Sequence, residues 1–406
     1  MSDISDSSVR FDTVKLEPFG PIGIIGHTAN RDFTDKVNKV LSEKRASRVA
    51  KGTTPYIHSP GYSRKDYIFD TELVRFQTGE GKFVMGESSR GHDIFIITDV
   101  LSHNLTYDLT VGEHTISADD HYRDLIRMVS CCMGKAKRVN VIMPFVYEGR
   151  REKLDSHRES YDCAEMLQTL YNLGVSKLIM FDPHDERIAN AVPLMDIEMP
   201  QCRFKIIQTL LDRFGSVKID SDSTMVVSPD EMGARRAIRY SSILNLPLGI
   251  FYRDRDYSVK VNGDHPIKEF KFLGDDVEGK DILLIDDMIN SGSTMARTSR
   301  KLKDLGAKDI YCLAPFGLFT DGLKLFDDLA AEGIIKAVLC TNLIYRTEEL
   351  LQRSWYVDVD MVPYVARIID AINLDESVYD LINSTDRIEA ATKQIRLGEL
   401  FDEFNE

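Results

Sequence analysis

The segment 281–295, DILLIDDMINSGSTM, constrains the fold of this 406-residue chain more than any other part of it. Its four apolar residues, 282–285, are typical of a short buried strand, and two adjacent carboxylates, Asp286 and Asp287, follow directly. A small polar loop comes next, and then a helical stretch that Gly306 closes. Strand, loop and helix in this order direct backbone N–H groups and a helix N-terminus toward one point, which favours the binding of a phosphate group.

The paired acids indicate what the phosphate belongs to. Asp286 and Asp287 lie at the carboxyl end of the predicted strand, where open α/β sheets bind ligands. An anion-binding loop beside two carboxylates indicates a phosphorylated sugar, whose hydroxyls or metal ion the acids would hold. The alternative is an ordinary strand-to-helix turn with solvated acids. We favour the ligand site, because paired acids directly after a fully apolar strand rarely lack a counter-ion.

Length, composition and charge narrow the class of protein. A chain of 406 residues can form two domains, each with its own core, and 43% apolar with 29% charged residues is ordinary for a soluble protein. The net charge of −14 argues against general nucleic-acid binding, although local basic pockets for phosphate remain compatible with it. No apolar run approaches the roughly 18 residues of a membrane span, and the N-terminus lacks a secretion signal. Six cysteines without a CxxC spacing indicate buried free thiols, as in a reducing compartment. Together with the charge and the missing apolar run, this leads us to expect a cytoplasmic protein that binds neither nucleic acid nor membrane.

Predicted strands and helices alternate along most of the chain, which favours parallel sheets with right-handed crossovers. The strands are expected at 21–25, 92–98, 139–144, 175–181, 224–227, 248–252, 282–285, 310–314 and 337–341. The helices are expected at 33–44, 124–135, 160–173, 204–214, 233–244 and 295–305. Similar halves flank about residue 200, which predicts two α/β domains.

The predicted organisation therefore has four parts, and the first domain carries two insertions or long loops. The parts are a polar leader at 1–18, a first domain at 19–199 with insertions near 46–65 and 103–121, a second domain at 200–358, and a helical tail at 359–406 that could fold back on the first domain.

Polar residues follow three further predicted strands. Asp182-Pro183-His184 follows KLIMF, Asp230 follows MVVSP, and Arg253 and Arg255 follow LGIFY. The carboxyl ends of parallel strands meet along one edge, so these acids, the imidazole and the guanidinium groups can converge on one ligand. Each residue also has a simpler interpretation: a histidine bonded to loop backbone, an Asp230 that caps the next helix, and a solvated charge run.

Taken together, these segments resemble the phosphoribosyl pyrophosphate (PRPP) synthetase, or ribose-phosphate pyrophosphokinase, family over about residues 20–385. The strand, DD and loop of 281–295 are similar to the PRPP-binding motif that the family shares with type I phosphoribosyltransferases. The other matching segments are FQTGE at 76–80, ESSRGHD at 87–93, PFVYEGRREK at 144–153, DPH at 182–184, VVSPD at 226–230 and DVEGKD at 276–281.

The resemblance implies a fold, an activity and partners. The fold would be α/β, with two phosphoribosyltransferase-like domains, each a mostly parallel sheet flanked by helices. The activity would be Mg²⁺-dependent transfer of an intact diphosphoryl group from ATP to ribose 5-phosphate, giving PRPP and AMP for nucleotide biosynthesis. The assembly would be a homo-oligomer, either a dimer or a hexamer built from dimers.

The resemblance also assigns roles to residues. Asp286 and Asp287 would engage the ribose hydroxyls directly or through Mg²⁺, and Asn290, Ser291, Gly292, Ser293 and Thr294 would hold the 5-phosphate. His184 and Asp230 would position Mg²⁺ on ATP. Phe76, Glu80, Arg150 and Arg151 would contact ATP, the first two of them across a subunit boundary. Arg253 and Arg255 would act in the catalytic loop.

The chain departs from the family pattern chiefly in that loop. The family sequence K-R-R corresponds to Arg253, Asp254 and Arg255, so the expected lysine is an arginine and the middle position is acidic. A guanidinium is longer, planar and bidentate, so this exchange is not conservative, and Asp254 weakens the local positive field. Asn290 replaces a common Asp, Arg151 replaces Gln, and Thr78 replaces Asp or Asn.

The residues of the metal and sugar sites therefore match the family pattern better than the residues of the catalytic loop do. This difference leaves two alternatives open. One is a non-catalytic regulatory relative that binds nucleotide or sugar phosphate and assembles with an active enzyme. The other is a phosphoribosyltransferase that consumes PRPP, which fits the 281–295 segment but not the DPH, SPD and N-terminal segments.

Overall fold

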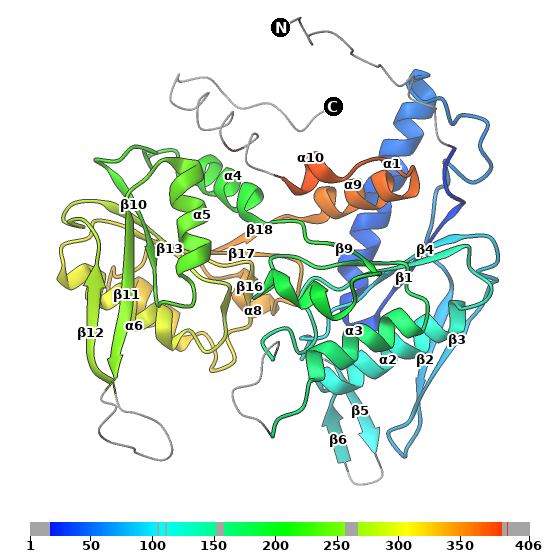
Figure 1. Cartoon of the computed structure of the whole chain (residues 1–406), viewed down its shortest axis with the longest axis horizontal. Coiled ribbons are helices and arrows are strands. Elements are labelled where there is room, and N and C mark those ends of the chain that lie inside the picture. The colour runs from blue at the N-terminus through cyan, green and yellow to red at the C-terminus, as the bar shows by residue number, and fades with distance from the viewer. Residues whose placement is uncertain are drawn as a thin grey trace, which may run out of the picture.

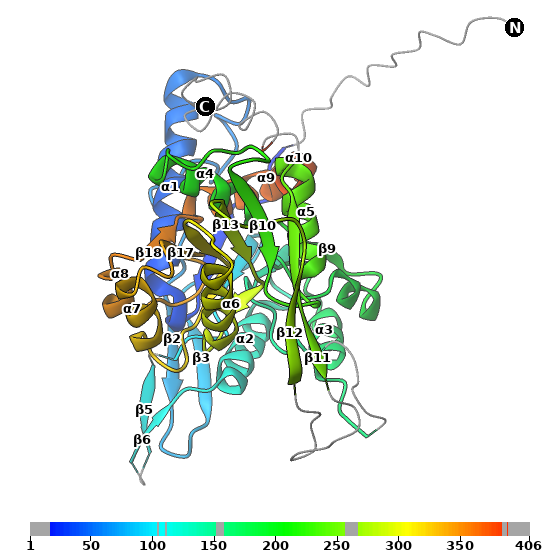
Figure 2. The same ribbon diagram turned by 90° about the vertical axis from the view of Figure 1, so that its left-hand side faces the viewer.

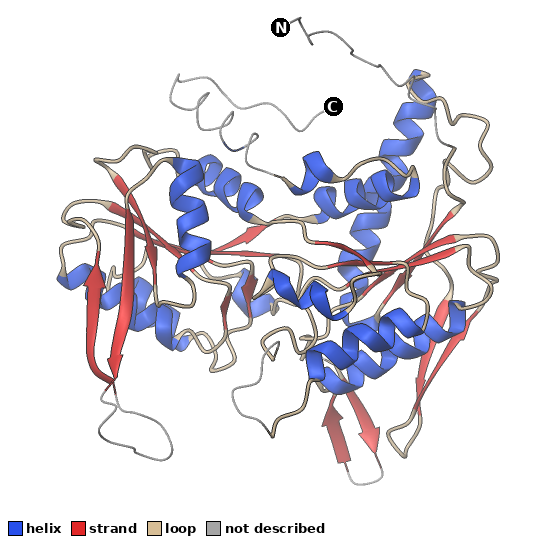
Figure 3. Ribbon diagram, viewed as in Figure 1, coloured by secondary structure: helices blue, strands red, loops and turns tan. Residues whose placement is uncertain are grey.

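Two mostly parallel sheets, each with helices on both faces, form the protein in a computed structural model (Figure 1, Figure 3). The structure describes residues 17–103, 105–109, 112–151, 158–255, 267–383 and 388. Most of the predicted leader and the end of the predicted tail lie outside these residues. Within the described ranges, no helix combines the length and apolarity needed to cross a bilayer.

The first sheet is wholly parallel, in the order β1-β4-β7-β8-β9. Its strands are β1 (Ile22–Gly26), β4 (Asp93–Ile97), β7 (Arg138–Ile142), β8 (Lys177–Ile179) and β9 (Asp196–Glu198). The short η1 (Thr28–Asn30) and α1 (Arg31–Lys51) cover one face, and α2 (Ala118–Cys132) and α3 (Asp162–Asn172) cover the other. Residues of β1, β4 and β7 are buried throughout, as a parallel sheet covered on both faces requires.

The second sheet has the order β12-β11-β10-β13-β15-β17-β18, and only β12 runs antiparallel to its neighbour. Its strands are β10 (Thr224–Ser228), β11 (Leu248–Arg255), β12 (Ile267–Leu273), β13 (Asp281–Ile285), β15 (Ile310–Leu313), β17 (Ala337–Thr341) and β18 (Tyr356–Val359). One face packs on α4 (Arg203–Arg213) and α5 (Ala234–Leu244), and the other packs on α6 (Ser293–Asp304), α7 (Lys324–Ala331) and α8 (Glu348–Leu351). The predicted α/β class with two mostly parallel sheets is confirmed.

The two predicted insertions contain more regular structure than expected. Residues 46–51 are helical, because α1 has no helix breaker before Gly52, whose left-handed conformation (φ 65°) ends it. Part of 103–121 is a hairpin of β5 (Thr106–Leu109) and β6 (Gly112–Thr115), and α2 then begins at Ala118. Ser117 caps α2 in a reciprocal capping box with Asp120, a signal that the prediction missed.

After β18 the chain returns to the first sheet. There, α9 (Val362–Asn373) lies against α1, and α10 (Tyr379–Ile382) follows it (Figure 2). Arg45 of α1, whose side chain is 0% exposed, donates hydrogen bonds to Asp370 (2.7 Å) and to Asn373 (2.8 Å). Arg138 at the start of β7 pairs with Asp375 (2.8 Å). Buried ion pairs and hydrogen bonds thus join the C-terminal helices to the first sheet.

We predict that Asp370→Asn lowers the free energy of unfolding by about 3–5 kcal/mol, because it leaves the buried Arg45 guanidinium without its counter-charge. The matched control is Asp328→Asn, which removes an exposed pair with Lys324 (2.8 Å) and should leave the free energy of unfolding close to that of the wild type. Urea denaturation measures both. Equal stability of the two variants would show that the Arg45–Asp370 ion pair does not stabilise the contact between the C-terminal helices and the first sheet.

Candidate active site

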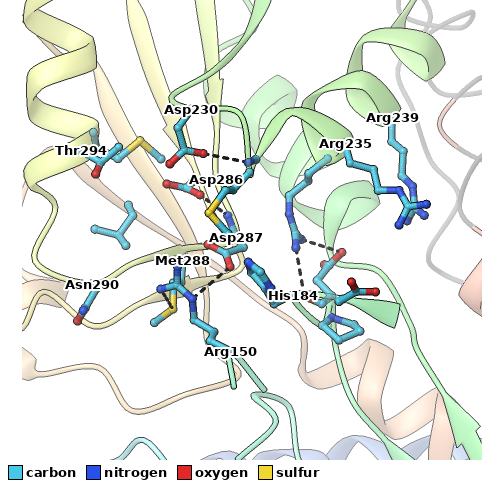
Figure 4. A pocket seen from close by; sticks show the side chains of 18 of the residues that line it. Arg150, His184, Asp230, Arg235, Arg239, Asp286, Asp287, Met288, Asn290 and Thr294 are labelled. Atoms are coloured by element: carbon cyan, nitrogen blue, oxygen red, sulfur yellow. Dashed lines mark hydrogen bonds and ion pairs between the residues drawn. The ribbon is translucent and has the colours of Figure 1, made fainter. Parts of the chain in front are cut away.

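A single cavity of about 540 Å³ lies where the carboxyl ends of strands from both sheets approach each other (Figure 4). Most of the residues predicted from the sequence line it: Arg150, His184, Asp230, Asp286, Asp287, Asn290, Ser291, Gly292, Ser293 and Thr294. Arg150 and His184 follow strands of the first sheet, whereas the others follow β10 and β13 of the second. The expectation of a single sheet edge was therefore wrong, because the site lies between the edges of two sheets.

The loop after β13 is built as an anion-binding turn. The Asp286 N–H donates to Leu313 O (3.0 Å), and the short β14 (Met288–Ile289) pairs with β16 (Phe316–Gly317). Gly292 then adopts φ 84° and precedes α6, whose first N–H groups have no acceptor within the helix. These groups adjoin the cavity, and the dipole of α6 favours an anion there.

Gly292 is required by the packing as well as by its backbone conformation. A Cβ atom at this position would lie 2.2 Å from Cε2 of Phe326, a buried residue of α7. The close approach of the loop to Phe326 of α7 fixes the conformation of the turn. The sequence of the loop alone therefore does not predict this conformation.

Three carboxylates concentrate negative charge beside this loop. Burial, together with the neighbouring Asp287 and Asp230, raises the pKa of Asp286 well above its ordinary value. Asp230 Oδ1 accepts a hydrogen bond from the Gly233 N–H (3.0 Å), so Asp230 caps α5 and also lines the cavity. The nearest described cation to Asp287 is Arg150, whose Nε lies 3.9 Å from Asp287 Oδ2. A ligand cation or a hydroxyl donor would relieve this charge.

Within the DPH segment, the aspartate and the histidine have different surroundings. Asp182 adopts φ 41°, accepts a hydrogen bond from the Cys202 N–H (2.7 Å) and pairs with Arg236 (3.2 Å). Asp182 therefore fixes the start of α4, and both Asp182 and His184 line the cavity.

His184, Asp230, Asp286 and Asp287 are the groups through which the cavity could hold a divalent cation. Among the described residues, no three His, Cys, Asp or Glu side chains form a ready metal site. The three carboxylates of this set fit a hard cation that keeps several waters and binds ligand phosphates, as Mg²⁺ does, and His184 could bond to such a water.

Three of the four expected ATP contacts, Phe76, Glu80 and Arg151, do not reach the cavity in this chain. Phe76 and Glu80 form the turn between β2 (Thr71–Arg75) and β3 (Gly81–Met85), where the Phe76 N–H donates to Glu80 O (2.8 Å). Phe76 is 47% exposed. Arg151 is exposed, and its N–H donates to Glu148 O (2.8 Å). Of the three, none is among the described residues that line the cavity.

The strand at 248–252 was predicted to end before Arg253, and this prediction was wrong. β11 continues to Arg255, and Arg253 pairs with Phe270 and Arg255 with Ile267 in the antiparallel ladder with β12. The strand outruns β10, whose last pair is Ser228 with Ile250, because β12 supplies hydrogen-bond partners beyond that point. The side chains of Arg253 and Arg255 lie outside the described residues.

The prediction missed a group of arginines that lines the other part of the cavity. They are Arg187 of η2 (Glu186–Ala191), Arg203 of α4, and Arg235, Arg236 and Arg239 of α5. The spacing of Arg235 and Arg239, four residues apart in a predicted helix, was a signal that they share one face. The cavity thus joins an acidic part with an anion-binding loop to a part rich in arginine.

Known proteins resemble this chain in both halves. Residues 22–174 match the family described as the N-terminal domain of ribose phosphate pyrophosphokinase, and residues 199–321 match the phosphoribosyl transferase domain. A protein named putative ribose-phosphate pyrophosphokinase 2 from Streptococcus mutans is 25% identical over 284 residues, covering 70% of this chain and 78% of that protein. Its namesake from Lactococcus lactis is 25% identical over 271 residues, covering 66% and 75%.

The fold has a solved counterpart. The phosphoribosylpyrophosphate synthetase from Mycobacterium smegmatis superposes with a TM-score of 0.66 at 20% identity, covering 87% of this chain and 98% of that chain. That likeness establishes a shared arrangement of two phosphoribosyltransferase-like domains. With both domain families matched in the same order along the sequence, this chain belongs to the PRPP synthetase (ribose-phosphate pyrophosphokinase) family.

Proposed function

We propose that this protein is a ribose-phosphate diphosphokinase, which makes PRPP and AMP from ATP and ribose 5-phosphate. The observation that carries the proposal is that one cavity contains the anion-binding loop, the acid pair and both His184 and Asp230. In the reaction, the 1-hydroxyl oxygen of ribose 5-phosphate forms a bond to the β-phosphorus of ATP. The bond between that phosphorus and the oxygen bridging to the α-phosphate breaks, AMP leaves, and the hydroxyl proton is released.

In this proposal the loop 290–294 holds the 5-phosphate through backbone N–H groups and the hydroxyls of Ser291, Ser293 and Thr294. Asp286 and Asp287 hold the ribose hydroxyls. This orientation presents the 1-hydroxyl to the nucleotide, and positioning of this kind supplies much of the rate of phosphoryl transfer.

His184 and Asp230 would hold Mg²⁺ on ATP, and members of this family generally use Mg²⁺. The carboxylates fit this ion, because their mutual repulsion is offset by a divalent charge. Bound Mg²⁺ would supply neutralisation of the phosphate charge. Asp230 keeps its place through the hydrogen bond to Gly233, so its carboxylate is oriented before a ligand arrives.

Arg150 would contact ATP from within the same chain. The exposed hairpin turn that carries Phe76 and Glu80 would contact the adenine in a partner subunit, which requires at least a dimer. Arg151 is exposed outside the cavity and would need such an assembly or a rearrangement to reach ATP. The cytoplasmic location stays a prediction.

Arg253 and Arg255 would neutralise charge on the transferring phosphates. The replacement of the family lysine by Arg253 and the acidic Asp254 favour the second candidate, a regulatory relative that binds the substrates without converting them.

Incubation of the purified protein with ATP, ribose 5-phosphate and Mg²⁺ separates the two candidates. We predict that AMP and PRPP appear in equal amounts, and that neither forms when ribose 5-phosphate is omitted. Quantitative chromatography of the products measures both. Saturable binding of both substrates without AMP would contradict the enzymatic proposal and support the regulatory one.

Replacing Gly292 tests the phosphate loop. Gly292→Ala should weaken ribose 5-phosphate binding about 10- to 100-fold, because the new Cβ collides with Phe326 and displaces the loop. Gly333→Ala is the matched control, since Gly333 also has a positive φ (68°) but nothing lies within 4 Å of its added Cβ. Calorimetric titration with ribose 5-phosphate should leave the control unchanged. Equal affinities of both variants would show that the loop does not hold the sugar phosphate.

Replacing Asp286 tests the assignment of the acid pair to the sugar. Asp286→Ala should weaken ribose 5-phosphate binding about 10- to 100-fold and leave ATP binding close to that of the wild type, because the lost hydrogen bonds are made to the sugar. Alanine is chosen because the side-chain amide of asparagine could still form hydrogen bonds with the sugar hydroxyls. Asp304→Ala, at the exposed end of α6, is the control. A similar loss for both ligands would assign Asp286 to the nucleotide as well.

A further inference from the structure

The turn 76–80 is held by an arginine that lies directly before it. Arg75 is the last residue of β2, and its side chain is 10% exposed, whereas the neighbouring Phe76 is 47% exposed. Arg75 Nη1 donates a hydrogen bond to Gly79 O (3.3 Å), which lies within the turn. The turn also closes on itself, because the Gly79 N–H donates to Phe76 O (2.8 Å) and the Thr78 hydroxyl donates to Glu80 Oε2 (2.9 Å). The Arg75 guanidinium therefore links an exposed turn to a part of the domain that is nearly buried.

Asp124 of α2 connects this arginine to the body of the first domain. Its carboxylate is fully buried, and it accepts hydrogen bonds from Nη2 of Arg75 and from Nη1 of Arg127. His27 Nε2 lies 4.0 Å from Asp124 Oδ2. Burial alone would raise the pKa of Asp124, but His27, Arg75 and Arg127 together lower it below its ordinary value. A charged acceptor makes stronger hydrogen bonds than a neutral one, so Asp124 fixes the orientation of Arg75.

The strand that follows the turn packs against the same carboxylate. β3 lies against α2, and a Cβ atom at Gly81 would lie 2.7 Å from Nη1 of Arg127 and 3.1 Å from Oδ1 of Asp124. A larger residue at this position would displace the Arg127 guanidinium from Asp124. Both ends of the turn, Arg75 before it and Gly81 after it, are thus placed against α2.

The hairpin β5–β6 adds an aromatic contact to this arrangement. It lies beside β2 and β3 (Figure 2), and the ring centroid of Tyr107 in β5 lies 5.3 Å from Cζ of Arg75, within the range of a cation–π contact. Arg75 and Arg127 share the single negative charge of Asp124, so the electron-rich ring face interacts favourably with charge that the carboxylate does not neutralise. The hairpin belongs to 103–121, one of the two segments predicted as insertions into the first domain.

We propose that Tyr107, acting through Arg75, is a positioning residue for the turn 76–80 and thereby for recognition of the adenine. This inference rests on the proposed function, in which Phe76 and Glu80 contact the adenine. If a ligand had to order an exposed turn as it bound, the lost conformational entropy would weaken binding. Arg75 holds the turn before the nucleotide arrives, and Tyr107 holds Arg75. The inserted hairpin is therefore an element that raises nucleotide affinity, although Tyr107 is not among the described residues that line the cavity.

Binding of ATP and of inorganic tripolyphosphate to the full-length protein, measured by calorimetric titration with Mg²⁺, tests this role. We predict that Tyr107→Ala weakens ATP binding about fivefold, the loss expected for one cation–π contact. Tripolyphosphate binding should not change, because tripolyphosphate lacks the adenine. Tyr107→Phe should bind ATP as the wild type does, because a phenyl ring keeps the π face. Asp108→Ala is the matched control, since Asp108 is the exposed neighbour of Tyr107 and points to the opposite face of β5.

Arg75→Lys provides a second variant that keeps the positive charge beside Asp124. A lysine cannot make the two hydrogen bonds of the guanidinium fork at once, so this variant should also weaken ATP binding about fivefold or more and leave tripolyphosphate binding unchanged. The thermal unfolding midpoint of each variant verifies that it is folded.

The outcomes separate the positioning role from the proposed function. A selective loss of ATP affinity in Tyr107→Ala that Tyr107→Phe reverses supports the role even if the wild type forms no AMP. Unchanged ATP affinity in Tyr107→Ala and Arg75→Lys overturns it, and formation of AMP by the wild type would then leave the proposed function standing. Equal losses for ATP and tripolyphosphate also overturn it, because the hairpin would then act on the phosphates or on the fold and not on the adenine.

Discussion

A shared apolar core holds the carboxyl edges of the two sheets around one cavity. The same cluster of buried residues contains Ile24 and Phe95 of the first sheet and Val226 and Leu283 of the second. Parallel sheets need cover on both faces, and α1, α4, α5 and α9 provide it on the face where the cores of the two sheets are continuous. The ion pair of Arg45 with Asp370 then ties the C-terminal helices to this layer. Because the core cannot shear without exposing apolar surface, it fixes where the strand ends meet.

The sequence predicted the parts of this arrangement that depend on local pattern. The apolar residues 282–285 and the acids after them correspond to β13 and to the acid pair at the cavity, because a fully apolar run bounded by polar residues has few other solutions. It could not predict that Arg150 and His184 come from a different sheet, since strand order depends on contacts far apart in the chain. The length of β11 likewise depends on its pairing with β12. The capping box at Ser117 was readable, and its omission displaced the predicted start of α2.

Charge is distributed unevenly within the cavity, and the net charge of the chain conceals this. Asp230, Asp286 and Asp287 lie beside the loop 290–294, whereas the arginines of α4, α5 and η2 line the opposite part. Such separation would orient a ligand that has a metal-bound end and a polyanionic end.

A crystal structure with ribose 5-phosphate, Mg²⁺ and the non-cleavable analogue α,β-methylene-ATP would show whether the sugar phosphate and the nucleotide share this cavity. We predict that the 5-phosphate contacts the N–H groups of 290–294, that the ribose hydroxyls face Asp286 and Asp287, and that the phosphates of the analogue occupy the same cavity near His184. Two ligands in separate pockets, or a nucleotide bound away from His184 and Asp230, would contradict it.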